Sequence, residues 1–280
     1  MISSPIALTG ETVAAHYDEL DLFYREIWGE HVHHGFWKSG RESCEQAARQ
    51  LVELVAERAE IRRGTRVCDI GCGYGATARL LAHELGAEMT AITISPAQFR
   101  FASARMSDDP IRYALGDWLR HDFASQSFDA AIAIESSEHM PDLRAFFTQA
   151  FRVLRPGGRL VVSAWLAREN FSRLENRFLF EPICRGARMP HMGTEQGYKR
   201  LGEESGFVCE SFADVTLQVK KTWPECVRQF WRALLRRPRH AKFLFHRHAQ
   251  NRIFAWTIFR IWLAYKTGAL RYGIFTFQKL

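Results

Sequence analysis

The sequence predicts an α/β fold, in which a doubly wound sheet of seven mostly parallel strands carries helices on both faces. Short apolar runs alternate with amphipathic helical patterns between residues 65 and 165, which is typical of repeated βα units. A glycine-rich turn, at residues 71–75, follows the first apolar run and precedes a helical pattern. In parallel sheets, ligands bind beyond the carboxyl ends of the strands, and this turn is expected there.

The expected elements alternate along the chain. Strands are expected at residues 65–70, 88–94, 111–115, 128–134, 159–165, 207–219 and 271–278. Helices are expected at residues 10–30, 43–60, 76–85, 95–106, 142–154, 194–205, 223–236 and 240–265, with a further amphipathic stretch at 169–188. Ser95 as N-cap, followed by proline, begins one helix, and Gly86 ends another.

The turn sequence distinguishes between two ligands, a dinucleotide and S-adenosylmethionine. A dinucleotide site needs G-x-G-x-x-G and an acidic residue about 20 positions beyond the first glycine. Here Gly75 comes one position early, and the second strand ends without an acid. The ammonium group of a methionine moiety suits Asp69 beside the turn. These features favour S-adenosylmethionine and leave a nicotinamide oxidoreductase as the alternative.

The run Asp69-Ile70-Gly71-Cys72-Gly73-Tyr74-Gly75 resembles the signature of class I S-adenosylmethionine-dependent methyltransferases. Further family signposts follow in order at residues 116–118, 127–129 and 154–160. Residues 16–18 with 28–37, 92–98, 135–142 and 272–279 resemble the tocopherol-methyltransferase-like group, which is similar to sterol, coclaurine-type N- and cyclopropane fatty-acid synthase-type enzymes. The resemblance implies a Rossmann-like fold, S-adenosylmethionine as cofactor and S-adenosylhomocysteine as product.

The resemblance also divides the chain into three parts. Residues 1–62 are expected to form an N-terminal helical lid, and residues 63–167 the S-adenosylmethionine-binding core. Residues 168–280 complete the sheet and add helical insertions that shape the acceptor pocket.

Cofactor-binding residues are assigned from the turn and the strand ends. They are Asp69, Gly71, Cys72, Gly73, Thr93, Ile94, Gln98, Asp117, Trp118, Glu135 and His33. Gln98 replaces the missing acid at the ribose, with Thr93 beside it, unless its side chain simply faces solvent. Asp117 is expected to accept from the adenine amino group, with Trp118 on the ring face, although a turn Asp and a core Trp fit the same pattern.

Four residues are expected to be catalytic, namely His139, Glu138, Glu135 and Tyr17. Histidine is well suited to take a proton near neutral pH, and the resembling N-methyltransferases use a Glu and a His at the positions of Glu138 and His139. The alternative is that these two residues only cap the next helix. Substrate contacts are expected from His34, Tyr24, Trp28 and His139, with His33 and His34 in the wall between cofactor and acceptor.

No metal site is expected, because neither the Cys68/Cys72 pair nor the histidines at 31, 33 and 34 have matching ligands elsewhere. The six cysteines are scattered, and residues 1–5 show no signal-peptide pattern. No uncharged apolar stretch reaches the roughly 18 residues of a membrane span. We therefore expect a cytoplasmic protein with reduced thiols.

Charge is concentrated at the end of the chain. The whole sequence has 38 Lys and Arg against 31 Asp and Glu, but from residue 220 onward fourteen basic residues accompany a single acid, Glu225. Aromatic residues interleave with these cations, and residues 253–265 are apolar nearly all round. This favours a lipophilic acceptor pocket with weak docking on anionic membrane. A solvated helix pair is the alternative, and nucleic acid is disfavoured because the family's Asn/Asp-Pro-Pro-aromatic motif for base amines is missing.

The predicted function is methyl transfer to a lipophilic small molecule, such as a prenylated, terpenoid or aromatic metabolite. Carbon is favoured slightly as the acceptor atom, with oxygen or nitrogen of a natural product as alternatives. A non-catalytic S-adenosylmethionine-binding partner protein is the alternative from another class. The sequence leaves the oligomeric state open.

Overall fold

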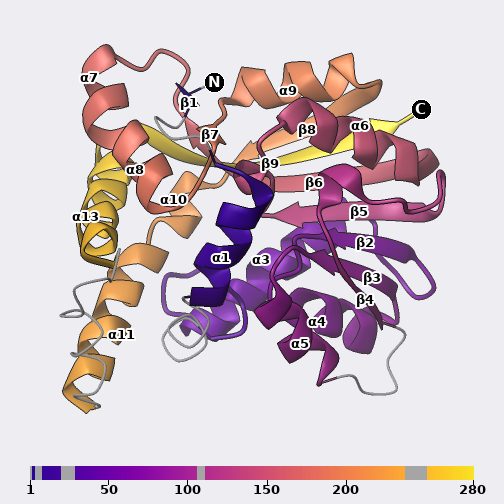
Figure 1. Cartoon of the computed structure of the whole chain (residues 1–280), viewed down its shortest axis with the longest axis horizontal. Coiled ribbons are helices and arrows are strands. Elements are labelled where there is room, and N and C mark those ends of the chain that lie inside the picture. Colours follow the sequence, from indigo (N-terminus) through magenta and orange to yellow (C-terminus); the bar gives the residue numbers. More distant parts are fainter. Residues whose placement is uncertain (1, 4–7, 20–28, 106–110, 237–250) are drawn as a thin grey trace.

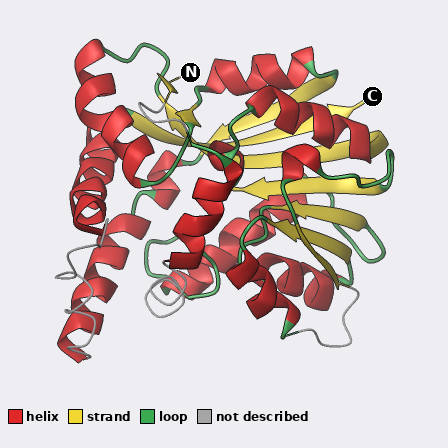
Figure 2. Cartoon of the chain, in the orientation of Figure 1, coloured by secondary structure: helices red, strands yellow, loops and turns green. Residues whose placement is uncertain are grey.

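A seven-stranded sheet lies at the centre of the molecule (Figures 1 and 2). The computed structural model describes residues 2–3, 8–19, 29–105, 111–236 and 251–280. The strands in spatial order are β4 (Ile111–Leu115), β3 (Glu88–Thr93), β2 (Arg66–Ile70), β5 (Phe128–Ile134), β6 (Leu154–Ala167), β9 (Leu270–Lys279) and β8 (Phe207–Asp214).

The sheet is parallel from β4 to β6, and β9 runs antiparallel between β6 and β8. In its centre Asp69 pairs with Ala91 on one side and Ile132 on the other. The predicted doubly wound, mostly parallel sheet of seven strands is therefore confirmed. A second, two-stranded pairing of β1 (Ile2–Ser3) with β7 (His191–Met192) was not predicted, because pairs this short have no periodicity to detect.

Helices cover both faces of the sheet. α3 (Cys44–Arg58) and α4 (Ala76–Leu85) pack with one hydrophobic cluster, and α6 (Leu143–Val153) and α9 (Glu195–Glu204) pack with the other. β5 contributes to both clusters, since Ala130 and Ile132 point to the first and Ala131 and Ala133 to the second. α5 (Pro96–Ser103) connects β3 with β4, and single 3₁₀ turns follow β4 (η2, Trp118–Arg120) and β5 (η3, Ser137–His139).

Most of the remaining helices gather beside one end of the sheet, at the left of Figure 1. They are α7 (Arg173–Glu175), the π-helical turn η4 (Asn176–Phe180), α8 (Glu181–Gly186), α10 (Thr216–Val219), α11 (Thr222–Arg236) and α13 (Asn251–Thr267). α1 (Gly10–Glu19) lies nearer the middle of that view and contacts α5. α13 contacts α8, η4 and α11, so these segments form one helical cap.

Several predicted boundaries differ from the observed ones. The strand expected at 207–219 ends at Asp214, because the Asp214 carboxylate accepts from the Thr216 backbone N–H at 3.0 Å and the chain turns into α10. The stretch at 169–188 divides into α7, η4 and α8, and β6 begins five residues early, at Leu154. Of the helix expected at 10–30, the structure describes Gly10–Glu19 as helical. Residues 20–28, and residues 240–250 of the last predicted helix, lie outside the described part.

The glycine turn after β2 has the conformation that its sequence predicts. Gly71, Gly73 and Gly75 all have positive φ, of 80°, 53° and 75°, which L-residues with side chains rarely adopt. The backbone N–H groups of Gly71 and Cys72 both donate to the Ile92 carbonyl at 2.9 Å, which joins the turn to the end of β3. A Cβ at Gly71 would lie 2.4 Å from the Ser136 Cβ, so this position has neither the conformation nor the room for a side chain.

We predict that Gly71→Ala lowers the free energy of unfolding by more than about 3 kcal/mol, because backbone strain and overpacking act together. Gly64→Ala is the matched control, since Gly64 has a φ of 77° and a Cβ added there would meet nothing within 4 Å. It should cost only about 1–2 kcal/mol. Urea denaturation of both variants measures the difference, and equal losses would contradict the contact with Ser136.

Candidate active site

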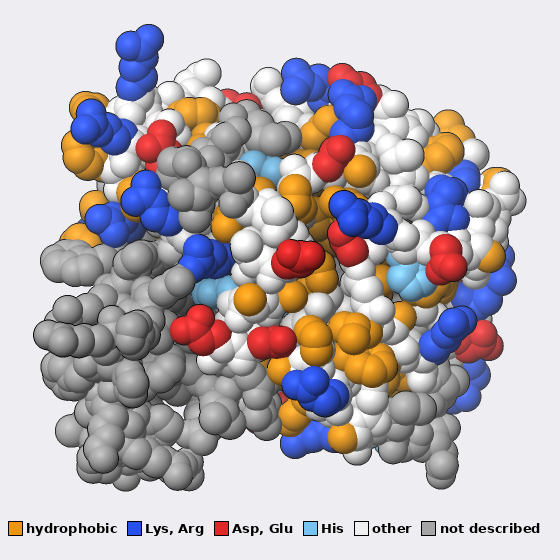
Figure 3. Space-filling view, in the orientation of Figure 1, with side chains coloured by type: hydrophobic (Ala, Val, Ile, Leu, Met, Phe, Trp, Pro, Cys, Tyr) orange, Lys and Arg blue, Asp and Glu red, His pale blue; other side chains and the backbone are white. Residues whose placement is uncertain are grey.

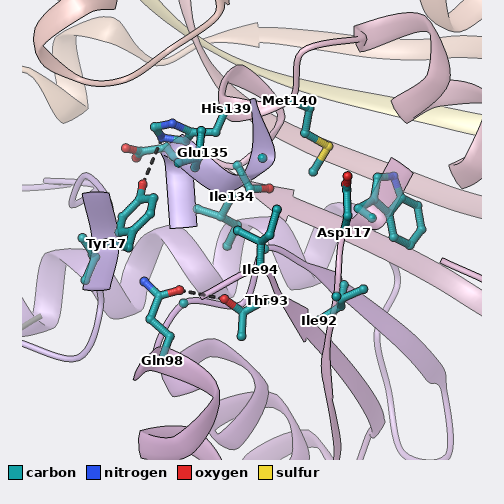
Figure 4. A pocket seen from close by; sticks show the side chains of 18 of the residues that line it. Tyr17, Ile92, Thr93, Ile94, Gln98, Asp117, Ile134, Glu135, His139 and Met140 are labelled. Carbon is teal, nitrogen blue, oxygen red and sulfur yellow. Dashed lines mark hydrogen bonds between the residues drawn. The ribbon is translucent and has the colours of Figure 1, made fainter. Parts of the chain in front are cut away.

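A cavity lies over the glycine turn, at the carboxyl ends of the parallel strands (Figure 4). Its lining comes from the turn, the ends of β3 and β5, the loops after β4 and β5, and α1. Counted together with its open mouth, the space between its lining residues is about 760 Å³. We call it the first cavity.

Most of the predicted cofactor residues line this cavity. They are Gly71, Gly73, Thr93, Ile94, Gln98, Asp117, Trp118 and Glu135. Thr93 donates its hydroxyl proton to the Gln98 side-chain oxygen at 2.7 Å, so these two lie side by side as expected, and Gln98 is buried rather than solvent-facing. Asp117 caps η2, and the Trp118 indole N–H donates to the Phe146 carbonyl at 3.3 Å.

Three other residues predicted at the cofactor do not line the first cavity. Asp69 and Cys72 are buried next to the turn, and His33 lines a second cavity instead. Burial raises the pKa of Asp69 to about 7 and that of the Cys72 thiol well above its usual value. The Cys72 thiol therefore keeps its proton. The contribution of Cys72 to the turn is its backbone N–H, which donates to the Ile92 carbonyl.

The turn and Asp69 fit the polar end of S-adenosylmethionine. The Asp69 Oδ2 atom is buried and has no hydrogen-bond partner within the protein, which is costly unless a donor arrives. A Cβ at Gly73 would meet nothing within 4 Å, so the backbone is open on the ligand side. An ammonium group, directly or through water, would satisfy Asp69, and the N-terminus of α4 adds a favourable backbone dipole for a carboxylate.

A second cavity adjoins the first. Its lining includes His33, His34, Glu138, Trp165, Trp223 and Ile261. Tyr17, Val32, Glu135 and His139 line both cavities and form the wall between them. The expected wall residues His33 and His34 thus line the second cavity and not the first. Tyr24 and Trp28, also predicted at the substrate, lie outside the described residues.

Glu135 is the most densely hydrogen-bonded side chain of the wall. Its carboxylate accepts from the His34 backbone N–H at 2.7 Å, from the His34 ring at 3.0 and 3.1 Å, from the Trp165 indole at 2.8 Å and from the Tyr272 hydroxyl at 2.8 Å. Its backbone has a φ of 52°, which is uncommon outside glycine. Burial opposes ionisation, but the interactions with His34, His33 and Trp165 prevail and lower the pKa of Glu135 to about 2.

His34 is held by the same network from its far side. Its Nε2 accepts from the Trp223 indole N–H at 2.9 Å and lies 3.1 Å from the Tyr265 hydroxyl. An indole N–H is a donor only, so Nε2 carries the lone pair, and the Nδ1 proton points to Glu135. Sequence reasoning missed Trp165, Trp223, Tyr265 and Tyr272, because nothing local marks a core aromatic residue as a carboxylate ligand.

Glu138, one turn further along the chain, has the opposite environment. It accepts from the Trp165 backbone N–H at 2.8 Å and from the Ser137 hydroxyl at 3.1 Å, without a cationic partner. Burial, together with the charge of Glu135, raises the pKa of Glu138 to about 8, against the effect of the Trp165 N–H. The two carboxyl groups therefore differ in protonation at neutral pH, as acid–base pairs in active sites often do.

His139 connects the wall to α1. Its Nδ1 lies 3.2 Å from the Arg188 carbonyl oxygen, which only accepts, so Nδ1 carries the proton. Nε2 then accepts from the Tyr17 hydroxyl at 3.0 Å, which is the pairing that the sequence predicted (Figure 4). Burial lowers the pKa of His139, which keeps the ring neutral and able to take a proton.

Asp18, the neighbour of Tyr17, was missed as a site residue. Its carboxylate accepts from the Ser95 hydroxyl at 2.5 Å and from the Ala97 backbone N–H at 3.1 Å. These bonds attach α1 to the N-terminus of α5 and so place Tyr17 over the cavity. The signal in the sequence was its place beside Tyr17 within a family motif.

The histidines at the lid contact one another. His31 Nδ1 lies 3.2 Å from His33 Nε2, and His33 Nδ1 lies 2.8 Å from the His34 carbonyl oxygen. Within the described part of the chain, no group of three or more His, Cys, Asp or Glu side chains is arranged to hold a metal ion. These contacts engage both ring nitrogens of His33 with protein groups.

Comparison with known proteins is consistent with this site. Residues 68–162 match the family described as "Methyltransferase domain". The chain is 31% identical to tocopherol O-methyltransferase of Arabidopsis thaliana, over 95% of this chain and 81% of that protein. It is 28% identical to 2-methyl-6-phytyl-1,4-hydroquinone methyltransferase of Synechocystis, over 95% of this chain and 87% of that protein.

Two further comparisons bear on extent and fold. The chain is 30% identical to a probable tocopherol O-methyltransferase of Oryza sativa subsp. japonica over 81% of its own length, but spans only 65% of that protein. The structure of a cyclopropane synthase from Mycobacterium tuberculosis superposes with a TM-score of 0.83, covering 99% of this chain and 100% of the other at 18% identity. The matches support S-adenosylmethionine as cofactor and give no support to the dinucleotide alternative.

We predict that Glu138→Gln weakens the pH dependence of stability. The folded protein keeps the Glu138 proton up to about pH 8, whereas the unfolded chain loses it near its ordinary pKa of 4.5. The folded state binds more protons in this window, so the free energy of unfolding falls as pH rises through it. Between pH 5 and pH 8, the free energy of unfolding measured by urea denaturation should fall less in the variant than in the wild type. Some of the fall remains in the variant, because burial also raises the pKa of Asp69. An unchanged decline would mean that Glu138 is ionised in the folded protein.

The matched change Glu135→Gln should act with the opposite sign. The pKa of Glu135 is lowered to about 2, so its ionised form stabilises the fold above about pH 4.5, and this contribution is lost as pH falls through 2. Replacing the carboxylate removes it at neutral pH, on the order of 3 kcal/mol. The same denaturation series measures it, and a variant as stable as the wild type at pH 7 would contradict the network.

Proposed function

The chain belongs to the S-adenosylmethionine-dependent methyltransferases, and from this premise we propose that it transfers a methyl group to a lipophilic small molecule bound in the second cavity. When bound, S-adenosylmethionine supplies a methyl group on a positively charged sulfur. The observation that carries the proposal is the wall that the two cavities share, because cofactor and acceptor on its two sides would approach each other at Tyr17, Glu135 and His139.

The second cavity supports an apolar, partly aromatic acceptor. Indole and aliphatic side chains, including Trp165, Trp223, Met189 and Ile261, make up much of its lining. The names of two relatives support such an acceptor, because they specify tocopherol and a phytylated hydroquinone. We therefore propose a prenylated, terpenoid or aromatic metabolite as acceptor.

His139 is the proposed general base. Its Nε2 lone pair accepts from the Tyr17 hydroxyl. A phenolic hydroxyl of the acceptor would donate to Nε2 in place of Tyr17, or would donate to the Tyr17 hydroxyl. Transfer of the proton to Nε2 leaves Nδ1–H bonded to the Arg188 carbonyl, which favours the charged ring. Tyr17 either relays the proton or orients the acceptor.

Glu135 and Glu138 are proposed to divide the electrostatic work. The ionised Glu135 offers a fixed negative charge beside the transferring methyl group and any cationic character in the acceptor. Glu138 retains its proton at neutral pH and can hold or release it as charge develops. Glu135 is positioned by backbone, ring and hydroxyl donors and Glu138 by a backbone N–H and the Ser137 hydroxyl, so neither has to reorganise during the reaction.

We favour carbon as the methylated atom. Removing the proton from an aromatic hydroxyl increases electron density at the oxygen and at the neighbouring ring carbons, so one base serves both outcomes. The name of another relative, a sterol 24-C-methyltransferase, supports the carbon option. Oxygen or nitrogen methylation of a natural product is the alternative, and the position of the label in the product distinguishes them.

The first experiment incubates the protein with methyl-labelled S-adenosylmethionine and a panel of prenylated hydroquinones, phenols, terpenoid alcohols and lipophilic amines. We expect label in at least one lipophilic product, with release of S-adenosylhomocysteine. The panel also includes lipids extracted from a lysate. If the protein binds the cofactor but transfers label to no compound of the panel, it is a non-catalytic S-adenosylmethionine-binding partner protein instead.

With a productive acceptor, we predict that His139→Ala lowers kcat by 10²- to 10⁴-fold while S-adenosylmethionine affinity, measured by calorimetry, changes little. The wild-type pH–rate profile should show an acidic limb below pH 6.5, because burial lowers the pKa of His139, and the variant should lack this limb. His83→Ala, on the exposed side of α4, is the control. Wild-type turnover in the His139 variant would disprove the general-base role.

A further inference from the structure

A basic and apolar patch lies on the outer side of α10 and α13. It consists of Leu217, Lys220, Lys221, Phe259, Trp262 and Lys266, which we call the docking patch. All but Phe259 line one shallow surface hollow, and the Phe259 ring lies 5.7 Å from the Trp262 ring. Leu217 is 72% exposed, Phe259 51% and Trp262 39%. Large apolar side chains this accessible have to be explained when they gather in one place.

Exposed apolar groups concentrate on the helical cap. Of the eight large hydrophobic side chains exposed in the described part, three belong to the docking patch, and Leu174 and Phe178 lie on α7 and η4. η4 contacts α13, so both sets belong to the same cap. Figure 3 shows hydrophobic and basic side chains together along the upper left edge, where Figure 1 draws α7 and α8. The remaining three, Leu115, Val208 and Leu280, lie at scattered positions on the sheet.

The charge of this region is predominantly positive. Glu225 is the only acid in α10, α11 and α13, and it pairs with Arg228. The Lys266 ammonium lies 4.9 Å from the centre of the Trp262 ring, and the Lys221 ammonium lies 4.7 Å from that of Trp37. Lysines beside aromatic rings can place their stems along an apolar surface and their charges at its polar edge. A fitting partner is therefore both apolar and anionic.

α13 separates this patch from the second cavity. Thr257 and Ile261 line the cavity, whereas Trp262 and Lys266 line the surface hollow. Tyr265 lines that hollow, and its hydroxyl lies 3.1 Å from His34 Nε2, inside the Glu135 network. A partner on the outer face of α13 would thus lie one helix away from the proposed acceptor site. Among the helices described, none has the length and apolarity to cross a bilayer.

We propose that the docking patch holds the protein on the surface of an anionic lipid bilayer. Trp262, Phe259 and Leu217 enter the headgroup region, and the exposed Lys220 and Lys266 contact anionic headgroups. Lys221, whose ammonium donates to the Gly40 carbonyl, adds its charge from beside them. Each Lys near such a surface strengthens binding about fivefold, so the attachment is reversible and depends on salt. The inference goes beyond the proposed reaction and needs no acceptor, so its test can succeed or fail independently of methyl transfer.

The test is co-sedimentation of the full chain with vesicles of phosphatidylcholine, with and without phosphatidylserine. We expect binding only when phosphatidylserine is present, and weaker binding at high salt. Lys220→Gln with Lys266→Gln should weaken it roughly 25-fold, and Phe259→Ser with Trp262→Ser should weaken it further at every salt concentration. Thermal unfolding and cofactor affinity should match the wild type, which shows that the variants fold.

Two control pairs test whether the effect belongs to the patch. Leu115→Ser with Val208→Ser removes apolar groups that are 47% and 43% exposed on the sheet. Arg112→Gln with Arg200→Gln removes two exposed charges, one on β4 and one on α9. Both should bind vesicles like the wild type. The proposal is overturned if the patch variants bind as tightly as these controls, if phosphatidylserine makes no difference, or if the chain binds single-stranded RNA but no vesicle. It is equally overturned if the wild type is a dimer and Phe259→Ser with Trp262→Ser makes it a monomer without changing vesicle binding, because the patch would then be a contact between two copies of the chain.

Discussion

The buried carboxylate of Glu135 is the interaction on which the site depends. It collects donors from the loop at His34, from β6 through Trp165 and from β9 through Tyr272. An isolated carboxylate in this position would be strongly destabilising, whereas one with four donor groups is held in its ionised form. The positive φ of Glu135 is tolerated because these bonds fix the backbone around it. The loop that carries His34 and the sheet are therefore joined by hydrogen bonds to one carboxylate. The helical cap is connected to it through His34, which Trp223 and Tyr265 contact.

This arrangement also sets the chemistry that the wall can support. Glu135, which accepts from the His34 ring, is ionised, while Glu138 three residues later keeps its proton because of burial and the neighbouring charge of Glu135. His139 completes the series with a lone pair aimed at Tyr17. The charge of Glu135 and the base His139 thus lie in the wall between the two cavities, and the proton held by Glu138 lies in the second cavity. In the proposed reaction, these are the three things that methyl transfer to a hydroxylated ring needs from the protein.

Much of the cofactor half could be predicted from the sequence because its determinants are local. The spacing of Gly71, Gly73 and Gly75 requires positive φ, and all three have it. Thr93 and Gln98 are five residues apart and meet across one strand end. The acceptor half was less predictable: His33 and His34 were placed in the wall but lie in the second cavity, and Trp165, Trp223, Tyr265 and Tyr272 were not foreseen.

By itself, then, the sequence determined the order of the strands in the large sheet and of the helices between them, the glycine turn and the family's cofactor, since each follows from periodicity or from residues close together in the chain. The tertiary structure decided which side chains meet at the wall. His34 and Glu135 are 101 residues apart, Tyr17 and His139 are 122 apart, and His34 and Tyr265 are 231 apart. Contacts over such separations leave no local pattern, because they depend on how β9, α13 and the lid loop pack against the sheet. The same packing leaves Trp262 exposed on one side of α13 and places Ile261 in the second cavity on the other.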